Sequence, residues 1–446
     1  MYDPLHDRHP GENNPYPNSY WSEHSGEAPL DDGQLTQDID ADVVIIGAGY
    51  TGLSCALHLA RAYGIKAIVL EANQTAWGCS GRNAGFILKS TGRKPWSDMA
   101  KEWGEEVMRG IYQEVCDGVE TVKSLIDEGI DCDPQTPGYI RVAHKASMFP
   151  DLVEQAKLLR KRFNYQVDIL SREDIHQQFM ADQNAYGAIR FHDGIGINPL
   201  KLAWGYQRLA RAEGVRIHPG TPVLHWTESD NKQVLVTPKA RVKASKVVLA
   251  TNGYTPKGLH LSVANRTLPV LSQIIVTEPL SEEQIQQCNF LTSNVVMDTR
   301  ALKYYYRKLP DNRILFGGRG AITGKSAEDP YYANRLLKVL KQSFPALANL
   351  TYQHAWSGWI CMSLDDIPHI NSAENNSNVV YAMGYCGNGV SFSVQAGKRL
   401  ADKIAGKALP NIPLYQKNLP KFPLPALRRV GQWGYFHYGL IKDKFF

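Results

Sequence analysis

The sequence predicts an α/β fold, α+β overall, with two domains between which the chain passes more than once. Three observations support this prediction. An apolar run near residue 42 leads into a glycine-rich turn, short strand-like segments follow in the middle of the chain, and later apolar runs return to the first layer. With 446 residues and 43% hydrophobic content, the chain can bury the cores of two domains.

The first element is an apolar strand that ends in the glycine-rich turn. In this turn, Gly47 permits the tight backbone geometry, Gly49 leaves space for a pyrophosphate, and Gly52 lets the next helix pack on the strand. The N-terminus of that helix points its partial positive charge and its free N–H groups at the phosphates. The pattern therefore predicts a Rossmann-like domain that binds a dinucleotide.

An acidic residue completes the pattern. Glu71 follows the second apolar run, residues 67–70, where a carboxylate accepts hydrogen bonds from an adenosine ribose and repels a 2′-phosphate. The motif favours FAD or NAD over NADP. The alternative is a glycine turn without a ligand, but strand, glycines, helix, strand and acid follow one another in the order that a nucleotide site requires.

The spacing of apolar residues predicts the later elements. Residues 99–128 carry apolar side chains three or four positions apart, so we expect one long amphipathic helix there. Residues 139–142 and 273–277 are typical of strands in a separate antiparallel sheet. Residues 234–236 and 246–250 also resemble strands, and we expect them to return to the nucleotide-binding layer.

These elements give a division of the chain into interwoven parts. Residues 1–40 are rich in Pro, Asn, Asp and Gly, which predicts an extended arm. We assign the other residues as follows: 41–95, 180–262 and 355–410 to the nucleotide-binding domain, 96–179 and 263–354 to a substrate-binding domain with a mixed or antiparallel sheet, and 411–446 to a basic, aromatic tail.

Composition narrows the choice of partners. The sequence shows no signal-peptide or membrane-spanning stretch, so we expect a cytoplasmic protein. Its seven cysteines form no Cys-x-x-Cys pair or His/Cys cluster, which indicates no disulfide framework and no metal site. The net charge of +5 is small, and nothing indicates nucleic-acid binding. We expect the tail to fold back on this chain or a neighbouring subunit, with contact to an anionic membrane as the less favoured alternative.

Four further segments resemble a known family. Residues 77–86, Trp-Gly-Cys-Ser-Gly-Arg-Asn-Ala-Gly-Phe, are similar to the second flavin-contacting segment of D-amino-acid-oxidase-like FAD-dependent oxidoreductases. Val223 stands in the setting of that family's adenine-contacting strand. Residues 250–254 resemble its second pyrophosphate-side loop, and residues 384–390 resemble its C-terminal flavin loop. The resemblance covers about residues 15–430 and implies FAD as the cofactor.

Within the family, shorter motifs resemble gamma-glutamylputrescine oxidoreductases and related amine oxidases. These motifs are Ser19–Trp21, Gly49–Ser54, Ser80–Asn83, Tyr305–Arg307 and Trp356–Gly358. The resemblance implies that hydride transfer to the flavin oxidises a C–N bond of an amine or amino acid, giving an imine that water hydrolyses. Asn388 replaces the usual loop histidine, and Ser391 stands where sarcosine oxidases carry a lysine. We therefore leave open whether oxygen or another electron acceptor reoxidises the flavin.

The glycine turn and the resembling segments together define the expected cofactor site. The helix expected at residues 393–400 would point its N-terminus at the pyrimidine end of the flavin and stabilise negative charge there. The expected cofactor-binding residues are Gly47, Gly49, Tyr50, Thr51, Gly52, Glu71, Ala72, Gly78, Cys79, Ser80, Gly81, Arg82, Asn83, Ala84, Gly85, Val223, Thr251, Gly253, Gly384, Gly387, Asn388, Gly389 and Val390.

The expected catalytic residues are Tyr305, Arg307, Trp356 and Asn388. Alternation along a strand places Tyr305 and Arg307 on one face, where Arg307 either grips a substrate carboxylate or pairs with a structural acid. Trp356 is a candidate wall of a pocket that lowers the pKa of a substrate amine by desolvation. Cys361 lies near the position where sarcosine oxidases attach flavin covalently, but a buried, unreactive thiol is favoured, so we expect non-covalent FAD.

Two alternatives remain from the sequence. The first keeps the fold and changes the substrate, as in an FAD-dependent 2-hydroxy-acid or D-amino-acid dehydrogenase. The second is a flavin-bearing accessory protein that acts on a protein partner and uses the aromatic, basic tail for docking.

Overall fold

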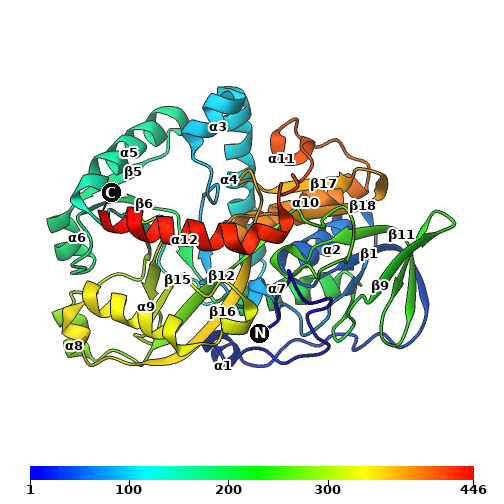
Figure 1. The fold of residues 1–446 in the computed structure, drawn as a ribbon, viewed down its shortest axis with the longest axis horizontal. Coiled ribbons are helices and arrows are strands. Elements are labelled where there is room, and N and C mark those ends of the chain that lie inside the picture. Colours follow the sequence, from blue (N-terminus) through cyan, green and yellow to red (C-terminus); the bar gives the residue numbers. More distant parts are fainter. Residues whose placement is uncertain (446) are drawn as a thin grey trace.

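The first of two large sheets contains the strands that we expect in the nucleotide-binding layer (Figure 1). This computed structural model describes residues 1–445; Phe446, which belongs to the predicted tail, lies outside the described residues. The strand order is β17-β18-β11-β1-β2-β8, and β10 and β9 extend the sheet from β11. The strands are β1 (Ile39–Ile46), β2 (Ile68–Leu70), β8 (Arg216–His218), β9 (His225–Ser229), β10 (Lys232–Val236), β11 (Arg241–Leu249), β17 (His369–Ala373) and β18 (Asn376–Met383).

The central strands of this sheet are parallel, because β1 pairs in parallel with both β2 and β11, and β11 pairs in parallel with β18. Parallel strands are covered on both faces and carry continuous apolar runs, as Val43–Ile46 and Val247–Leu249 do. Their carboxyl ends meet at one edge of the sheet. That edge is where ligands bind in open sheets of this kind.

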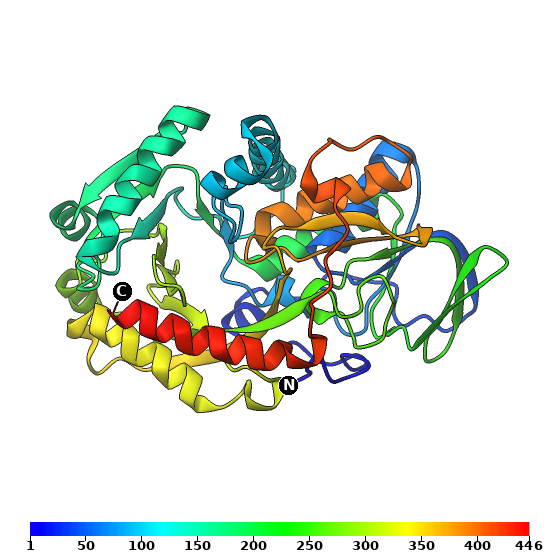
Figure 2. The same cartoon turned by 45° about the horizontal axis from the view of Figure 1, so that its top comes forward.

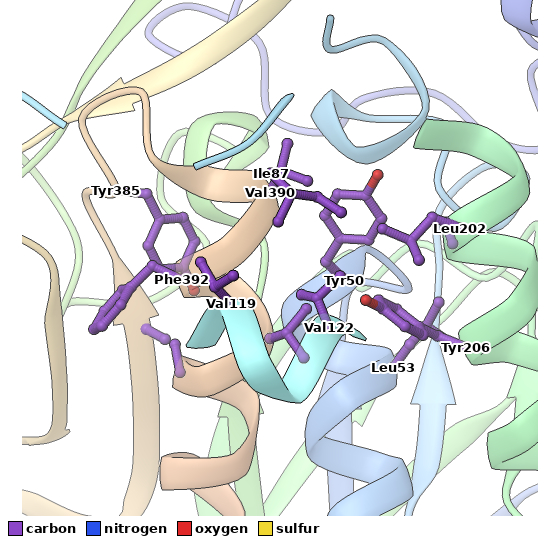
Figure 3. Close-up of a cluster of buried hydrophobic side chains, with 14 of the residues drawn as sticks. Tyr50, Leu53, Ile87, Val119, Val122, Leu202, Tyr206, Tyr385, Val390 and Phe392 are labelled. Carbon is purple, nitrogen blue, oxygen red and sulfur yellow. The ribbon is translucent and has the colours of Figure 1, made fainter. Parts of the chain in front are cut away.

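Four helices form a buried cluster beside this edge (Figure 3). They are α2 (Tyr50–Tyr63), α4 (Glu105–Asp127), α7 (Pro199–Ala212) and α10 (Gly389–Ile404). Tyr50, Val119, Leu202 and Phe392 each contribute a buried side chain from one of these helices. The helices and the first sheet thus share a hydrophobic core. This packing fixes the position of the segments that follow the strands.

The second sheet is antiparallel except where β13 pairs with β4. Its order is β16-β12-β15-β14-β13-β4-β6-β5, and β3 (Phe86–Ile87) pairs with β7 (Ile195–Gly196) as a separate ribbon. The strands are β4 (Tyr139–Val142), β5 (Val167–Ser171), β6 (Gly187–Phe191), β12 (Leu268–Thr277), β13 (Val295–Asp298), β14 (Tyr305–Lys308), β15 (Ile314–Arg319) and β16 (Tyr352–Met362). The predicted α/β class with a second mixed sheet is confirmed.

Two strands lie in a different sheet from the one that their sequence ranges suggested. Strand β6 falls in residues 180–262, and most of β16 falls in residues 355–410, both of which we assigned to the nucleotide-binding domain. Both strands belong to the second sheet. An apolar run predicts a strand but not its partner, because the pairing depends on the rest of the fold.

The expected helix over residues 99–128 is interrupted. Helix α3 (Trp96–Trp103) ends at Gly104, and α4 begins directly after it. Gly104 has a φ of +88°, a conformation that glycine adopts at low cost. The prediction of one continuous helix was therefore wrong, because the apolar spacing continues across Gly104, where the helical conformation is interrupted.

The N-terminal arm is folded against the body of the protein. It contains the short helix α1 (Tyr20–His24), capped by Ser19. Trp21 is 2% exposed, and its indole N–H donates to the carbonyl of Asn83 at 2.9 Å. The arm therefore packs against the segment 77–86, which resembles a flavin-contacting segment. It is less extended than the sequence predicted.

The C-terminal tail also folds back on its own chain, as expected. After α11 (Pro413–Gln416), helix α12 (Arg428–Phe445) crosses one face of the molecule in both views (Figures 1 and 2). Arg429 pairs with Asp3 at 2.7 Å, and the Asp443 carboxylate accepts from the backbone N–H of Ala301 at 2.7 Å. These contacts fix both ends of the helix.

Three of the remaining helices pack on the second sheet: α5 (Phe149–Phe163), α6 (Arg172–Gln178) and α9 (Pro330–Ser343). The short helix α8 (Glu282–Gln287) contacts the turn at Pro345–Leu347. In the part of the chain that the structure describes, no helix combines the length and apolar character needed to cross a membrane. Among the same residues, no cluster of three or more His, Cys, Asp or Glu side chains is arranged to hold a metal ion.

Candidate active site

A long groove follows the carboxyl ends of the parallel strands of the first sheet. The segments after β1, β2, β11 and β18 all reach it, which explains why motifs far apart in the sequence line one site. The expected cofactor residues that line the groove are Gly47, Gly49, Tyr50, Thr51, Glu71, Ala72, Gly78, Cys79, Ser80, Asn83, Val223, Thr251, Gly253, Gly387, Gly389 and Val390.

The glycine turn has the packing that the sequence predicted. A Cβ atom on Gly52 would lie 1.9 Å from the carbonyl oxygen of Gly47, so a side chain there would push α2 away from β1. Helix α2 begins after Gly49 without a side-chain cap. Its N-terminal end therefore remains directed at the groove, which suits a phosphate ligand.

The carboxylate of Glu71 is held in place by backbone donors. It accepts from the N–H of Ala48 at 2.8 Å and from the N–H of Asn73 at 3.1 Å. Burial raises the pKa of Glu71, while these backbone hydrogen bonds act in the opposite direction. The group is thus an oriented acceptor in the wall of the groove, as ribose recognition requires.

The other end of the groove lies at the N-terminus of α10. Gly387, Gly389 and Val390 line it, and the first turn of α10 carries no side-chain cap. The side chain of Asn388 donates instead to the carbonyl of Ser90, which ties this loop to the segment after β3. A helix dipole directed at this end fits the expected anionic reduced flavin.

Some expected cofactor residues support the groove from behind. Gly52, Gly81, Gly85 and Gly384 lie outside its lining. Arg82 is 7% exposed, and its guanidinium donates to the carbonyl of Trp77 at 2.7 Å and lies over the Trp77 ring. Trp77, Asn252, Tyr254 and Tyr385 also line the groove; they lie in the segments expected to contact the cofactor but were not among the residues selected from them. Thr221, two residues before Val223, lines it as well and was not predicted.

A large cavity adjoins the groove. It has a volume of about 1240 Å³ and lies against the second sheet, with walls also from α3 to α5. Cys79, Asn83, Ile360, Gly387 and Val390 line both spaces, so a ring held at the α10 end of the groove would face the cavity. This junction is the place where a substrate can meet the cofactor.

Tyr305 lies in the wall of this cavity, on the second sheet. A Cβ on Gly317 would lie 2.1 Å from the Tyr305 ring, so the ring rests across strand β15 at a position with no side chain. Its hydroxyl shares a 2.7 Å hydrogen bond with Ser272. Burial raises the pKa of Tyr305 to about 12, so near neutral pH it is a neutral phenol that orients a ligand.

Arg307 and Trp356 lie behind the cavity wall. Arg307 is 1% exposed, donates to the Gln135 side chain and the Ile197 carbonyl, and lies near the rings of Trp21 and Phe86. Trp356 donates to the carbonyl of Arg82 at 2.9 Å. The structure therefore brings Tyr305 and Asn388 into the cavity wall, while the contacts of Arg307 are those of a structural residue.

Cationic residues that the sequence analysis did not select line the cavity. They include Arg93, Arg141, Lys303 and Arg319. Arg319 ends β15 two residues after Gly317, so alternation along the strand places both on the face that carries Tyr305. That signal was present in the sequence, but only the pairing of the strands shows that this face lines the cavity.

Cys361 lies in the wall of the groove and is 1% exposed. Burial raises the pKa of its thiol well above the ordinary value. A neutral thiol is a poor nucleophile, so its surroundings favour the predicted non-covalent binding of the cofactor.

Comparison with known proteins agrees with this geometry. Residues 42–403 match the family described as FAD dependent oxidoreductase (DAO). The chain belongs to this family. This FAD-dependent oxidoreductase is 34% identical over 410 residues to gamma-glutamylputrescine oxidoreductase from Escherichia coli, and the match covers 90% of this chain and 92% of that protein.

Solved structures share the fold. The oxidoreductase is similar to an L-amino acid deaminase from Proteus vulgaris, with a TM-score of 0.69, 20% identity, and coverage of 89% of this chain and 96% of that chain. It is also similar to iminodiacetate oxidase from a Chelativorans species, with a TM-score of 0.69, 18% identity, and coverage of 85% and 99% respectively. The predicted family and its FAD cofactor are confirmed.

Proposed function

We propose that this oxidoreductase oxidises a C–N bond of an amine or amino acid, and that the resulting imine hydrolyses to a carbonyl product. A gamma-glutamylputrescine-like amine is the first candidate, because a relative of that name matches most of the chain. The observation that carries the proposal is the junction between groove and cavity at Cys79, Asn83 and Gly387. A substrate in the cavity would meet the cofactor ring only there.

The residues that line the cavity favour the neutral form of the substrate amine. Bound FAD supplies the acceptor for a hydride, and the amine must be neutral before its C–H bond can donate one. Phe86, Ile274 and Met297 give the cavity an apolar side, which favours the neutral amine by desolvation. Tyr305, as a neutral phenol, can accept or donate a hydrogen bond there. No histidine lines the cavity among the described residues, so the chain offers no imidazole base at this site.

Anaerobic reduction of the holoenzyme tests the proposal. The blue absorbance of the flavin would be followed after addition of gamma-glutamylputrescine, putrescine, sarcosine, proline, D-alanine or lactate. We expect bleaching by at least one amine, with an aldehyde or ammonia as product. Bleaching by lactate alone would favour the 2-hydroxy-acid alternative and contradict C–N oxidation. Admission of air to the reduced enzyme then shows whether oxygen or another acceptor reoxidises it.

A further inference from the structure

One part of the large cavity has an excess of positive charge. Ten Lys and Arg side chains line the cavity against three acidic ones, so its field favours anions. Three of the lining cations outside the second sheet have acidic partners: Lys89 pairs with Asp193, Lys157 with Glu154, and Arg162 with Glu105. The wall that the second sheet forms carries a separate group of cations, Arg141, Lys303 and Arg319.

The strand register places these cations beside Tyr305. Across the sheet, Arg319 of β15 is opposite Ser272 of β12, and Ser272 is in turn opposite Gly358 of β16. With strands about 4.8 Å apart, Arg319 lies roughly 10 Å across the sheet from Gly358, which lines the cavity next to the segments that reach the groove. Ser272 also holds the Tyr305 hydroxyl, so Arg319 adjoins the candidate reaction site.

Arg141 and Lys303 extend this cationic wall. Arg141 of β4 is opposite Met297 of β13, and Met297 is opposite Tyr305 of β14. Lys303 precedes β14 by two residues and lines the same cavity. The three cations thus flank Tyr305 on the sheet, and Arg141 and Arg319 both lie close enough to Lys303 to repel its charge.

No carboxylate compensates these three cations within residues 1–445. Arg141 donates to the neutral side chain of Gln155 at 2.8 Å. The acid that acts on Lys303 is Asp298, but this carboxylate already accepts from the side chain of Arg300 and from backbone N–H groups. Arg319 has no acidic partner, whereas Arg93 nearby is balanced by Asp366 at 3.3 Å.

Such an arrangement destabilises the free protein. Burial, together with repulsion from Arg141, Arg319 and Arg93, lowers the pKa of Lys303 to about 7. Burial and Arg93 also lower the pKa of Arg319. Uncompensated cations around a cavity are stabilised when an anion binds, and guanidinium groups bind carboxylates through two parallel hydrogen bonds.

We propose that the substrate is an amine with at least two carboxylates, which Arg319, Lys303 and Arg141 bind beside Tyr305. This inference rests on the C–N oxidation proposed above, and it favours a different substrate class from the first candidate named there. One carboxylate would compensate only one of the three cations, whereas two carboxylates leave a single positive charge in excess, and a second ammonium would be repelled by the cations. Gamma-glutamylputrescine carries a single carboxylate and two ammonium groups, so comparing it with a dicarboxylate amine tests the proposal most directly.

Binding of two matched ligands tests the site without turnover. Succinate and succinamate have the same length but differ by one carboxylate, and calorimetric titration of the FAD-loaded protein measures both. We expect succinate to bind at least about tenfold more tightly, and Arg319→Met and Lys303→Met to remove this preference. Arg319→Lys should restore part of it. Equal binding, no binding of either ligand, or an unchanged preference in Arg319→Met would overturn the proposal.

Two controls separate a local from a general effect. Lys123→Met removes a cation from α4 that pairs with Glu120 and lies outside the cavity lining, so succinate binding should not change. The FAD content of each variant reports whether the groove remains intact. A loss of succinate binding in Lys123→Met as large as that in Arg319→Met would show that overall charge, not the site, causes the effect.

The pH dependence gives an independent readout. Lys303 faces Arg141, Arg319, Arg93 and Asp298, and it is charged only below its lowered pKa of about 7. Succinate binding should therefore weaken as the pH rises from about 6 to about 9, with uptake of a proton on binding near neutral pH. Lys303→Met should bind weakly with a flat profile. A flat profile in the unmodified protein would contradict the role of Lys303.

Flavin reduction with matched amines distinguishes the two proposals. The series is sarcosine with one carboxylate, iminodiacetate and aspartate with two, and gamma-glutamylputrescine. We expect a dicarboxylate amine to reduce the flavin fastest. If sarcosine or gamma-glutamylputrescine is faster than every dicarboxylate, this inference fails and C–N oxidation stands. If no amine reacts although succinate binds with the expected preference, C–N oxidation fails and the anion site stands.

Discussion

The buried carboxylate of Glu114 should hold α10, whose N-terminus lies at the end of the groove where we expect the flavin. Glu114 of α4 is 4% exposed and accepts from Arg399 Nε at 2.9 Å, from the Gln395 amide at 2.9 Å and from the Tyr415 hydroxyl. Arg399 and Gln395 belong to α10, and Tyr415 belongs to α11. One carboxylate therefore connects three helices.

Replacement of one partner in a buried charge pair typically costs about 3–5 kcal/mol. Glu114→Gln should fall near the lower limit, about 3 kcal/mol, because Arg399 keeps its contact with Asp402 at 2.9 Å. An unfolding entropy of about 2 cal/mol/K per residue gives roughly 1 kcal/mol/K for this chain. The expected decrease in melting temperature is therefore about 3 °C.

The assay is thermal unfolding followed both by circular dichroism and by the fluorescence of released FAD. Glu120→Gln is the matched control, because Glu120 lies on the same helix, its side chain is 61% exposed, and its ion pair with Lys123 is on the surface. Hydrogen bonds and Arg399 hold the pKa of Glu114 below its usual value. Its contribution is thus present above about pH 4.5 and is lost as the pH falls through the lowered pKa. A melting temperature equal to that of Glu120→Gln at neutral pH would refute this reasoning.

Three further changes test the groove and the cavity. Gly52→Ala places a methyl group against the Gly47 carbonyl, so fluorescence titration should show FAD affinity reduced at least about tenfold, and an unchanged affinity would contradict the packing. Tyr305→Phe should slow flavin reduction about tenfold, because a hydrogen bond to the substrate is lost. The pH profile between about 7 and 9 should not change, because the phenol is neutral in this range. A pH profile that differs from that of the unmodified enzyme would show that Tyr305 ionises. Cys361→Ser should keep its FAD, because the buried thiol is neutral. Acid precipitation of the unmodified protein should release the flavin into solution. A yellow precipitate would instead reveal a covalent link.

The cofactor groove was predictable because its signals are local. The glycine turn requires close contact between residues five positions apart, and Gly52 shows that contact directly. Glu71 follows a strand that runs parallel to β1, so its carboxylate reaches the N–H of Ala48 by the geometry of the sheet alone. Such features depend on short stretches of chain, and a sequence carries them without an alignment.

The cavity was less predictable because long-range packing determines it. Alternation placed Tyr305 and Arg307 on one face, as β14 shows, but Phe86 and Trp21 come from distant segments and cover Arg307. Only Tyr305 remains in the cavity wall. Arg319 ends β15, and its place in the cavity follows from the pairing of β15 with β12 and β14. No local pattern encodes that pairing.

The anchor between Asp443 and the backbone of Ala301 and Leu302 affects how the enzyme should be handled in the laboratory. Ala301 and Leu302 directly precede Lys303. We therefore expect a tag fused after α12 to disturb the contacts of Asp443 and, through them, the position of this lysine. Ligand affinities measured on such a fusion could reflect the tag. The exposed turn between β9 and β10, at Asp230 and Asn231, is a safer insertion point for purification.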